Sequence, residues 1–554
     1  MKHSDDALNA PMPFTVVGDP LSDYRPEHLY HFLRRSAQQF PTRTALVFKN
    51  DRITYSELNT LVLRAAAGLQ RLGIARGDRI GICMPNHPIA VILYFAAMKA
   101  GATVVMMGPF YAEPALLGQA RDAGLSLIVT LDENLLRAKI ENVAKQASIK
   151  KVLLANPDTT RLFAGQLPKV DGDSSTTVDL SELLAFHAEP SSVSCDPLTD
   201  LAVIQYSGGT TGQPKGVMLT HGNFSAAIRQ FQIILPMIGL GTDTLLAAAP
   251  FSHISGMNGV LGPAIAWAAT IIVIDRFEAA ETARLCISNE VTYMLGVPTM
   301  FFALIEASEK LQLKWPALKC AVSGGAALPE AAKNRFEEVI GKPLLHAYGL
   351  TETSPPATMP YPNRSIPAAS CGEAVPGCEI QIRSPSDHSK ILPFGEIGEL
   401  CVRGPQVTLG YWDRPDLNRD AFVDGFLKTG DLAYISPNRL IYVVDRLKDI
   451  IICSGFNVYP IRVEEAIFQH PAISEAIVLG VPDAYRGETV KAFVTLREGY
   501  TLSLEQLQDF LSPLLSPIEM PKQLEIRDKL PRSPVGKLSR LKLREEIMSK
   551  KSLV

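Results

Sequence analysis

Residues 206–216 read Tyr-Ser-Gly-Gly-Thr-Thr-Gly-Gln-Pro-Lys-Gly, and they directly follow the apolar run Leu201 to Gln205. A short apolar run of this kind predicts a buried strand. Glycines let backbone amides approach an anion without obstruction from a Cβ atom, hydroxyl groups donate to phosphate oxygens, and a lysine supplies positive charge. The stretch therefore predicts a phosphate-binding loop. Its candidate residues are Ser207, Gly208, Gly209, Thr210, Thr211, Gly212 and Lys215.

This loop differs from a Walker A loop. The G-x-x-x-x-G-K-[ST] register is not met, and no helix start follows until Thr220. The alternative interpretation is a flexible polar turn. The ordered hydroxyl groups, followed by Pro214, Lys215 and Gly216, favour the phosphate loop over that alternative.

Helical and strand-like patterns alternate through the first half of the chain. Thr54 and Glu57 have the spacing of a capping box, and they precede apolar residues at helical intervals that end near Gly73. The alternation predicts an α/β fold in which helices cover layered sheets. Strands are expected at 79–83, 102–107, 126–130 and 151–155, and a further helix near 90–100.

The pattern changes after about Arg383, where turn residues and short strand-like runs predict a β-rich subdomain. From Asp449 onward the pattern predicts an α+β unit that is large enough to hold its own core. We therefore divide the chain into a large N-terminal domain, residues 1–447, and a small C-terminal domain, residues 448–554. The expected strands are 399–403, 439–444, 450–453, 473–479 and 490–496, with helices from Pro460 and near 504–515.

The composition excludes several classes of protein. The 554 residues are 47% hydrophobic and 20% charged, with a formal net charge of −3, which indicates neither a disordered chain nor a nucleic-acid binder. The 8 cysteines include no C-x-x-C pair, which argues against a zinc site of that kind, a thioredoxin-type centre and a disulfide scaffold. We expect a cytoplasmic protein in a reducing compartment.

Targeting and membrane segments are not expected. The N-terminal residues lack the apolar region of a secretory signal, and the C-terminal residues do not match a peroxisomal address. Residues 244–274 carry no charged side chain, but proline and glycine interrupt them, and the apolar run after Pro263 is only 11 residues long. That length is typical of a buried core element, so we predict no transmembrane helix.

Six further motifs follow one another along the chain. They are SGGAALPE at 323–330, YGLTE at 348–352, GELCVRGPQVTLGYW at 398–412, KTGD at 428–431, DRLKDIIICSGFNVYP at 445–460 and PRSPVGKLSR at 531–540. With the loop at 206–216 they resemble the signature motifs of the adenylate-forming superfamily, which includes acyl-CoA synthetases, luciferases and peptide-synthetase adenylation domains. The resemblance extends from about residue 45 to the C-terminus.

The resemblance implies a two-step reaction with ATP, Mg²⁺ and CoA as cofactors. A carboxylate attacks the α-phosphate of ATP to give an acyl-adenylate and pyrophosphate, and a thiol then displaces AMP. Lys537 matches a lysine that enters the site for the first step, where an ammonium group would stabilise the developing charge. Glu352 matches the carboxylate that binds Mg²⁺, an ion that prefers hard oxygen ligands. Thr211 and His253 complete the implied catalytic set.

The resemblance also implies how the nucleotide is bound. Tyr348 would offer a stacking face to adenine, Asp431 would accept both ribose hydroxyl groups, and Arg446 would reach the ribose and phosphate region. The other implied nucleotide-binding residues outside the loop are Gly324, Gly325, Ala326, Gly349 and Thr351.

In the superfamily the C-terminal domain rotates between the two steps. Lys448 matches the hinge position, and Gly455 and Phe456 match the loop beside the thiol channel. The resemblance therefore implies that the small C-terminal domain is mobile and that its motion affects turnover.

The acid is expected to be a medium- or long-chain fatty acid. His253 stands where amino-acid-activating relatives place an aspartate, so no acidic partner for a substrate ammonium group is present at this position. Residues 106–129 resemble bacterial long-chain fatty-acid ligases, although Gly108 replaces an expected asparagine and Ala112 replaces a hydroxyl residue. The apolar side chains expected around the acyl chain are Ile254, Met257, Val260, Leu261, Phe301 and Phe302.

Three alternatives stay open. The chain resembles aryl or hydroxycinnamoyl-CoA ligases as well, and it resembles fatty-acyl-AMP ligases that load an acyl carrier protein. A catalytically silent acyl-binding protein of the same fold is the third, and it is disfavoured because Lys215, Glu352, Asp431, Arg446 and Lys537 are all present. The expected partners are small molecules rather than nucleic acid, and peripheral membrane contact stays open.

Overall fold

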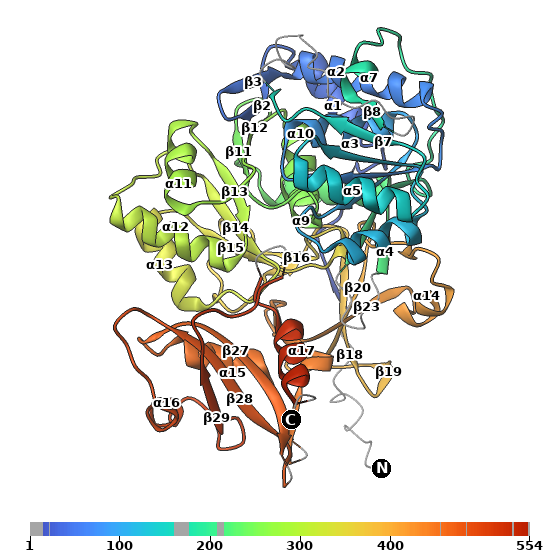
Figure 1. The fold of residues 1–554 in the computed structure, drawn as a ribbon. Coiled ribbons are helices and arrows are strands. Elements are labelled where there is room, and N and C mark those ends of the chain that lie inside the picture. Colours follow the sequence, from blue (N-terminus) through green and yellow to red (C-terminus); the bar gives the residue numbers. More distant parts are fainter. Residues whose placement is uncertain are drawn as a thin grey trace, which may run out of the picture.

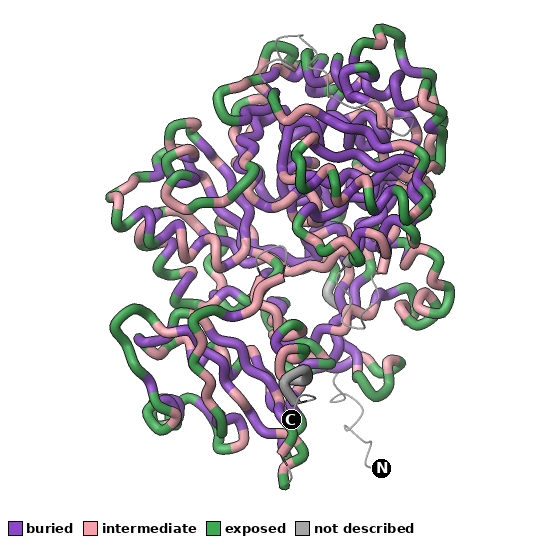
Figure 2. Tube along the Cα trace, in the orientation of Figure 1, coloured by how far each residue is buried: buried purple, intermediate pink, exposed green. Residues whose placement is uncertain are grey.

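The computed structural model describes residues 15–21, 23–159, 177–207, 215–454, 456–483, 485–533 and 537–551. Two layered sheets with their helices occupy the upper part of Figure 1, a β-rich sheet lies below them, and the C-terminal unit lies at the bottom. Figure 2 shows that buried residues follow the centres of the sheets and that exposed residues gather in loops. These parts confirm the predicted fold class.

The first sheet contains the strands on either side of the predicted phosphate loop. Its strands are parallel except at one edge, where β21 pairs with β10 and β10 pairs with β9 in antiparallel fashion. The order is β21 (Gly410–Tyr411), β10 (Lys215–Thr220), β9 (Leu201–Ser207), β5 (Thr103–Met107), β4 (Arg79–Cys83), β6 (Leu127–Leu131), β7 (Val152–Ala155) and β8 (Thr177–Asp179). The helices of this part are α2 (Tyr55–Arg71), α3 (Pro88–Lys99), α4 (Glu113–Ala123), α5 (Asn134–Gln146), α7 (Leu180–Leu184) and α8 (His221–Ile234).

The second sheet is parallel except at its β2–β3 edge. The order is β15 (Leu344–Ala347), β14 (Cys320–Gly324), β13 (Tyr293–Gly296), β11 (Thr244–Ala247), β12 (Thr270–Val273), β2 (Thr44–Phe48) and β3 (Asp51–Thr54). Its outer face packs against α11 (Ala279–Ser288), α12 (Pro298–Lys310) and α13 (Glu330–Ile340), which lie together on the left of Figure 1.

The main core joins the two sheets. Helix α3 is buried on every side from Pro88 to Met98, as an all-apolar helix must be, and α1 (Tyr30–Gln39) and α8 contribute to the same core. Helix α2 begins with the predicted capping box, in which the Glu57 amide donates to Thr54 Oγ1 and the Thr54 amide donates to Glu57 Oε2. The predicted strand and helix positions in this half of the chain are confirmed to within a few residues.

Residues 244–274 belong to this core and not to a membrane span. They form β11, α9 (Ile254–Gly256), a π-helical turn at Met257–Leu261, α10 (Gly262–Ala266) and β12. Among the residues that the structure describes, no helix is both long enough and apolar enough to cross a bilayer.

The predicted β-rich subdomain is a separate antiparallel sheet. Its path is β1 (Thr15–Val17), β18 (Glu379–Ser384), β20 (Gly398–Arg403), β23 (Phe426–Ile435) and β22 (Phe422–Val423), with β19 (Asp387–Ile391) beside β18 and β24 (Ile441–Arg446) beside β23. Smaller elements that surround it are η3 (Thr351–Thr353), β16 (Thr358–Met359), β17 (Glu373–Ala374) and α14 (Pro415–Ala421).

The C-terminal unit has its own sheet and its own core. Its strands are β26 (Phe456–Val458), β25 (Ile451–Cys453), β28 (Gly487–Leu496), β27 (Ile473–Asp483) and β29 (Gln523–Ile526), and its helices are α15 (Pro460–Phe468), α16 (Leu504–Leu511) and α17 (Arg540–Lys551). The chain leaves the β-rich sheet at Arg446 and enters this sheet at Ile451. The boundary at 447/448 stays a prediction, which this passage supports.

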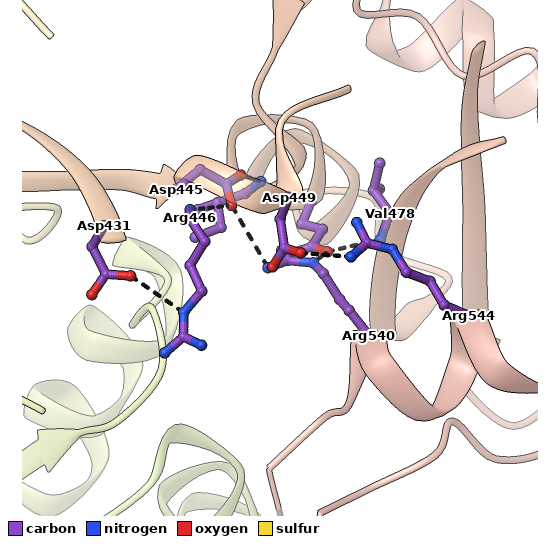
Figure 3. Close-up of polar contacts among 9 residues, drawn as sticks. Asp431, Asp445, Arg446, Asp449, Val478, Arg540 and Arg544 are labelled. Carbon is purple, nitrogen blue, oxygen red and sulfur yellow. Dashed lines mark hydrogen bonds and ion pairs between the residues drawn. The ribbon is translucent and has the colours of Figure 1, made fainter. Parts of the chain in front are cut away.

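Ionic contacts surround the passage between the two units. Arg544 Nη1 donates to Asp449 Oδ1 at 2.8 Å, and Arg540 Nη2 donates to Glu464 Oε2 at 2.5 Å. Arg540 Nη1 also lies 3.8 Å from Asp445 Oδ1. Figure 3 shows both arginines of α17 approaching the turn that contains Asp449, on the side away from Asp431. Of these contacts, the one between Arg540 and Asp445 joins α17 to β24, and the other two lie within the C-terminal unit.

Candidate active site

The predicted phosphate loop lies between two paired strands. Strand β9 ends at Ser207 and β10 begins at Lys215, and these two residues face each other in the antiparallel register. Helix α8 begins only at His221, with Thr220 as its N-cap, so no helix start follows the loop directly, as predicted. The predicted loop residues Gly208, Gly209, Thr210, Thr211 and Gly212 and the side chain of Ser207 lie outside the described residues.

The C-terminal unit delivers Lys537 to the glycine pair that follows β14. Gly325 has a φ of +77°, and a Cβ atom at this position would lie 2.4 Å from Lys537 Nζ. The left-handed backbone and the close approach both favour glycine. Burial, and then the positive charge of Arg446, lower the pKa of Lys537 to about 8. Lys537, Gly325 and Arg446 are therefore brought together, as the sequence predicted for one site.

Asp431 joins the two residues predicted to bind the nucleoside. The Tyr348 hydroxyl donates to Asp431 Oδ2 at 2.7 Å, and Arg446 Nε lies 3.2 Å from Asp431 Oδ1. Asp431 is only 4% exposed, and burial raises the pKa of its carboxyl group while Arg446 opposes that rise. Figure 3 shows the guanidinium of Arg446 directed from β24 toward Asp431 and away from Arg540.

Glu352, the predicted magnesium ligand, lies in the short helix η3. Its Oε1 atom accepts a hydrogen bond from the Tyr411 hydroxyl at 3.0 Å, and its carbonyl accepts from the Thr408 amide at 2.8 Å. Burial raises the pKa of Glu352, and the Tyr411 hydrogen bond and Arg446 counteract that rise. Carboxylate oxygens are hard ligands of the kind that Mg²⁺ prefers, so Glu352 fits this ion.

Tyr411 is a site residue to which sequence reasoning assigned no role. Besides its contact with Glu352, its ring centroid lies 5.5 Å from the ammonium nitrogen of Lys215. Its strand β21 pairs with β10, which places the ring beside the end of the phosphate loop. The residue lies inside the quoted motif at 398–412, but only strand pairing over a long sequence separation shows which residues it meets.

His253 presents a neutral imidazole. The Ser255 amide donates to His253 Nδ1 at 3.2 Å and the Ser255 hydroxyl lies 2.7 Å from the same atom. Because Nδ1 is an acceptor, the neutral ring carries its proton on Nε2. Burial, and secondarily the charge of Lys537, lower the pKa of His253 to about 3. The histidine therefore lies within electrostatic reach of Lys537 and carries an uncharged ring with its N–H at Nε2.

The expected apolar side chains around the acyl chain divide between two cores. Met257, Val260 and Leu261 are buried in the main core beside the His253 turn. Phe301 lies instead in the core on the outer face of the second sheet, where its ring makes a T-shaped contact with Phe336 at 5.4 Å between ring centroids. Phe301 is therefore a packing residue of α12.

A crevice opens where strands of both sheets end. Its apolar lining includes Met84, Phe110, Tyr111, Pro250 and Phe277, and its polar lining includes Asn86, Ser252 and Asp275. Gly108 and Tyr111 both line the crevice, and a Cβ atom at position 108 would lie only 2.6 Å from the Tyr111 ring. The glycine at 108, which departs from the expected asparagine, thus gives the Tyr111 ring its place in the crevice.

The remaining predicted residues lie at different distances from this centre. Gly349 packs against Pro355, where a Cβ atom would be 2.6 Å from Pro355 Cβ, and Thr351 begins η3. Lys448 lies in the turn between the two units. Phe456 is 64% exposed on β26, and Gly455 lies outside the described residues. The remaining nucleotide-binding position, Ala326, follows Gly325 beside His346.

Comparisons with known proteins agree with this geometry. Residues 33–412 match the family described as AMP-binding enzyme, and residues 462–537 match the AMP-binding enzyme C-terminal domain. The chain is 37% identical over 528 residues to a long-chain-fatty-acid–CoA ligase of Bacillus subtilis (strain 168), and the match covers 94% of each protein.

Two solved structures have a similar fold. ATP-bound MatB from Rhodopseudomonas palustris has a TM-score of 0.83 and 28% identity, with 94% of this chain and 98% of that chain covered. O-succinylbenzoate coenzyme A synthetase (MenE) from Bacillus subtilis, in complex with ATP and magnesium ion, has a TM-score of 0.78 and 28% identity, with 93% and 99% covered.

We expect Tyr411→Phe to weaken Mg²⁺-supported ATP binding about tenfold, because Glu352 loses the hydrogen bond that orients its carboxylate. Titration calorimetry with ATP, in the presence and absence of Mg²⁺, measures the effect. Affinity without Mg²⁺ should change much less.

Tyr361→Phe is the matched control, since the Tyr361 hydroxyl donates to Asp19 Oδ2 at the same distance of 3.0 Å outside this site. Equal loss of affinity in both variants, or loss that does not depend on Mg²⁺, would contradict the role of Tyr411.

Proposed function

Because the chain belongs to the AMP-binding enzyme family, we propose that it is an ATP- and Mg²⁺-dependent fatty-acyl-CoA synthetase that acts on long-chain acids. The observation that carries this proposal is the position of Lys537 Nζ against Gly325, beside Arg446 and within electrostatic reach of His253. A cation from the C-terminal unit thereby reaches residues that the N-terminal part supplies for the nucleotide.

In the proposed first step, a carboxylate oxygen of the fatty acid forms a bond to the α-phosphorus of ATP. The bond from that phosphorus to the bridging oxygen breaks, and pyrophosphate leaves. Lys537 would offset the negative charge that develops at the reacting oxygens, and Lys215 would neutralise the polyphosphate chain. Bound at Glu352, Mg²⁺ would supply further neutralisation of the phosphate oxygens.

The nucleoside end would be held by neighbouring groups. Asp431 would accept the ribose hydroxyl groups, Tyr348 would provide the face for adenine, and Arg446 would reach toward the phosphates. The neutral Nε2–H of His253 suits a donor to the fatty-acid carboxylate, because it pairs with the anion without fixing a second charge in the site.

In the proposed second step, the thiol of CoA loses its proton to solvent, its sulfur bonds to the acyl carbon, the bond from that carbon to the adenylate oxygen breaks, and AMP leaves. Lys537 has no part in this step. We propose that residues 448–554 rotate about Lys448, which withdraws Lys537 and brings the β26 region with Gly455 and Phe456 to the site. The exposure of Phe456 in the present arrangement supports a later contact.

An alkyl chain suits the surroundings of His253. No acidic residue occupies position 253 to pair with an amino group, and burial of each methylene contributes roughly 0.8 kcal/mol. The crevice beside Pro250 and Ser252 offers apolar walls for such a chain. We propose a cytoplasmic location and CoA as the acceptor; a carrier protein is the acceptor that the assay below distinguishes.

The proposal is tested by incubating the protein with ATP, Mg²⁺ and CoA and with saturated acids of graded length or hydroxycinnamic acids. We expect AMP and acyl-CoA in equal amounts, with the highest kcat/KM for a long-chain fatty acid. AMP without thioester would indicate a carrier-protein acceptor, and preference for the aromatic acids would indicate an aryl ligase. No AMP with any acid would overturn the proposal.

Lysine 537 gives a pH-dependent test of the first step. Its ammonium form is present below a pKa of about 8 and is lost as the pH rises through that value. We therefore expect kcat/KM for ATP in acyl-adenylate formation, measured without CoA, to fall toward tenfold per pH unit above about pH 8. In a Lys537→Ala variant, kcat/KM for ATP should be lower by about a hundredfold or more and should not decline further as the pH rises above about 8.

The same variant separates the two steps. Lys537→Ala should still form thioester from supplied acyl-adenylate, and Lys529→Ala, an exposed lysine near the same segment, should behave as wild type in both assays. If kcat/KM for ATP in Lys537→Ala still declined above about pH 8 as in wild type, or if both half-reactions were lost equally, the proposed role of Lys537 would be contradicted.

A further inference from the structure

Asp122, at the end of α4, contacts Tyr206 of β9 and also Trp412 and Arg414, which follow β21. The Tyr206 hydroxyl, one residue before β9 ends, donates to Asp122 Oδ2 at 2.5 Å. Arg414 Nη2 donates to the other carboxylate oxygen, and Trp412 Nε1 donates to the Asp122 carbonyl at 3.2 Å. We call Asp122, Tyr206, Trp412 and Arg414 the loop clamp.

The loop clamp packs the two strands together where the loop begins and ends. Tyr206 faces Gly216 in the β9–β10 register, and the Trp412 amide donates to the Gly216 carbonyl at 2.7 Å. A Cβ atom at Gly216 would lie 3.3 Å from both Trp412 Cβ and Tyr206 Cζ. Gly216 is therefore enclosed between two aromatic residues that both reach Asp122, so the separation of the loop ends depends on their positions.

Hydrogen bonds from Arg79 fix the backbone that directly follows Asp122. Arg79 of β4 donates from Nε to the Ala123 carbonyl at 2.7 Å and from Nη2 to the Gly124 carbonyl at 2.8 Å. The guanidinium carbon of Arg79 lies 5.7 Å from the centre of the Trp412 ring. The side chains of Asp122 and Arg414 are only 15% and 29% exposed. Removing one of them therefore leaves the other charge unpaired and poorly solvated.

The phenol of Tyr206 stays protonated and keeps its role as a donor. Burial, and then the hydrogen bond to Asp122 and the negative charge of that residue, raise the pKa of Tyr206 well above its ordinary value. A hydrogen bond to a charged group is worth more than one between neutral groups. The Tyr206–Asp122 contact is therefore a strong restraint directly beside the loop.

We propose that Asp122 is a positioning residue for ATP binding, because through Tyr206, Trp412 and Arg414 it holds the strand ends at Tyr206 and Gly216 between which the phosphate loop lies. The inference rests on the proposed function, in which the loop binds the polyphosphate of ATP. Asp122 acts through its neighbours and not by contact with the nucleotide. Small displacements of groups that orient a substrate reduce the reaction rate by large factors. Loss of the loop clamp should therefore weaken ATP binding and slow the reaction of ATP.

The proposed role predicts a selective defect. The loop serves polyphosphate, which is present in acyl-adenylate formation and absent from thioester formation. A clamp variant should therefore raise KM for ATP and slow the first half-reaction, and it should leave thioester formation from supplied acyl-adenylate unchanged. A purely structural role would lower the amount of folded protein and reduce both half-reactions in parallel.

The test compares Asp122→Ala, Asp122→Asn and Tyr206→Phe in the full chain. We expect KM for ATP to rise about tenfold or more in Asp122→Ala and about fivefold in Tyr206→Phe, with KM for the acid within about twofold of wild type. Asp122→Asn keeps an acceptor for Arg414 and a polar partner for Tyr206, so it should recover most of the ATP affinity.

Tyr55→Phe is the matched control. It removes a buried phenol hydroxyl that donates to the Ala269 carbonyl at 2.7 Å, in the core rather than beside the loop, and it should not change KM for ATP. An unchanged KM for ATP in a folded Tyr206→Phe protein, or parallel loss of both half-reactions in the clamp variants, would overturn the inference.

Failure of the proposed function gives a different result. Wild-type protein that forms no acyl-adenylate would refute the function itself. Wild-type protein that forms acyl-adenylate while Tyr206→Phe matches it at every ATP concentration would refute only the role of Asp122.

Discussion

The close approach of Lys537 to Gly325 is the contact on which the proposed site depends. A lysine from the C-terminal unit lies against a glycine of the N-terminal part, at a position where any side chain would collide with it. Burial, and then the positive charge of Arg446, lower the pKa of this lysine. A bound anion would offset both positive charges, and a polyphosphate is such an anion.

The turn that connects the two units is flanked by ion pairs. Asp431 on β23 holds Arg446 of β24, and three residues later Asp449 binds Arg544 of α17. The short turn 447–449 therefore lies between an ion pair that belongs to the nucleotide site and ion pairs that belong to the C-terminal unit. The contacts of Asp445 with Arg540 and with the Ile461 amide join the two sides of the turn, as does the approach of Lys537 to Gly325. The proposed rotation about Lys448 would therefore rearrange these contacts.

Much of the fold could be predicted from the sequence because local signals were strong. The capping box at Thr54 and the apolar strand before the loop each specify local backbone structure, and both are confirmed. Motif resemblance also indicated that Asp431, Arg446 and Lys537 belong together. Tyr411 and Asp122 were missed because their partners lie 59 and 84 residues away in sequence, and no periodicity connects residues across such separations. Phe301 was placed near the acid, but its helix packs on the outer face of the second sheet, which a pattern of apolar residues does not reveal.

The central claim is that one site joins a carboxylate oxygen to the α-phosphorus of ATP. Fatty acid labelled with ¹⁸O in its carboxyl group tests this most directly, with AMP and pyrophosphate analysed by mass spectrometry after turnover in the presence of CoA. The account predicts that one labelled oxygen passes from the acid to AMP and that pyrophosphate stays unlabelled. Label in pyrophosphate or in inorganic phosphate, or acyl-CoA formed together with unlabelled AMP, would contradict it.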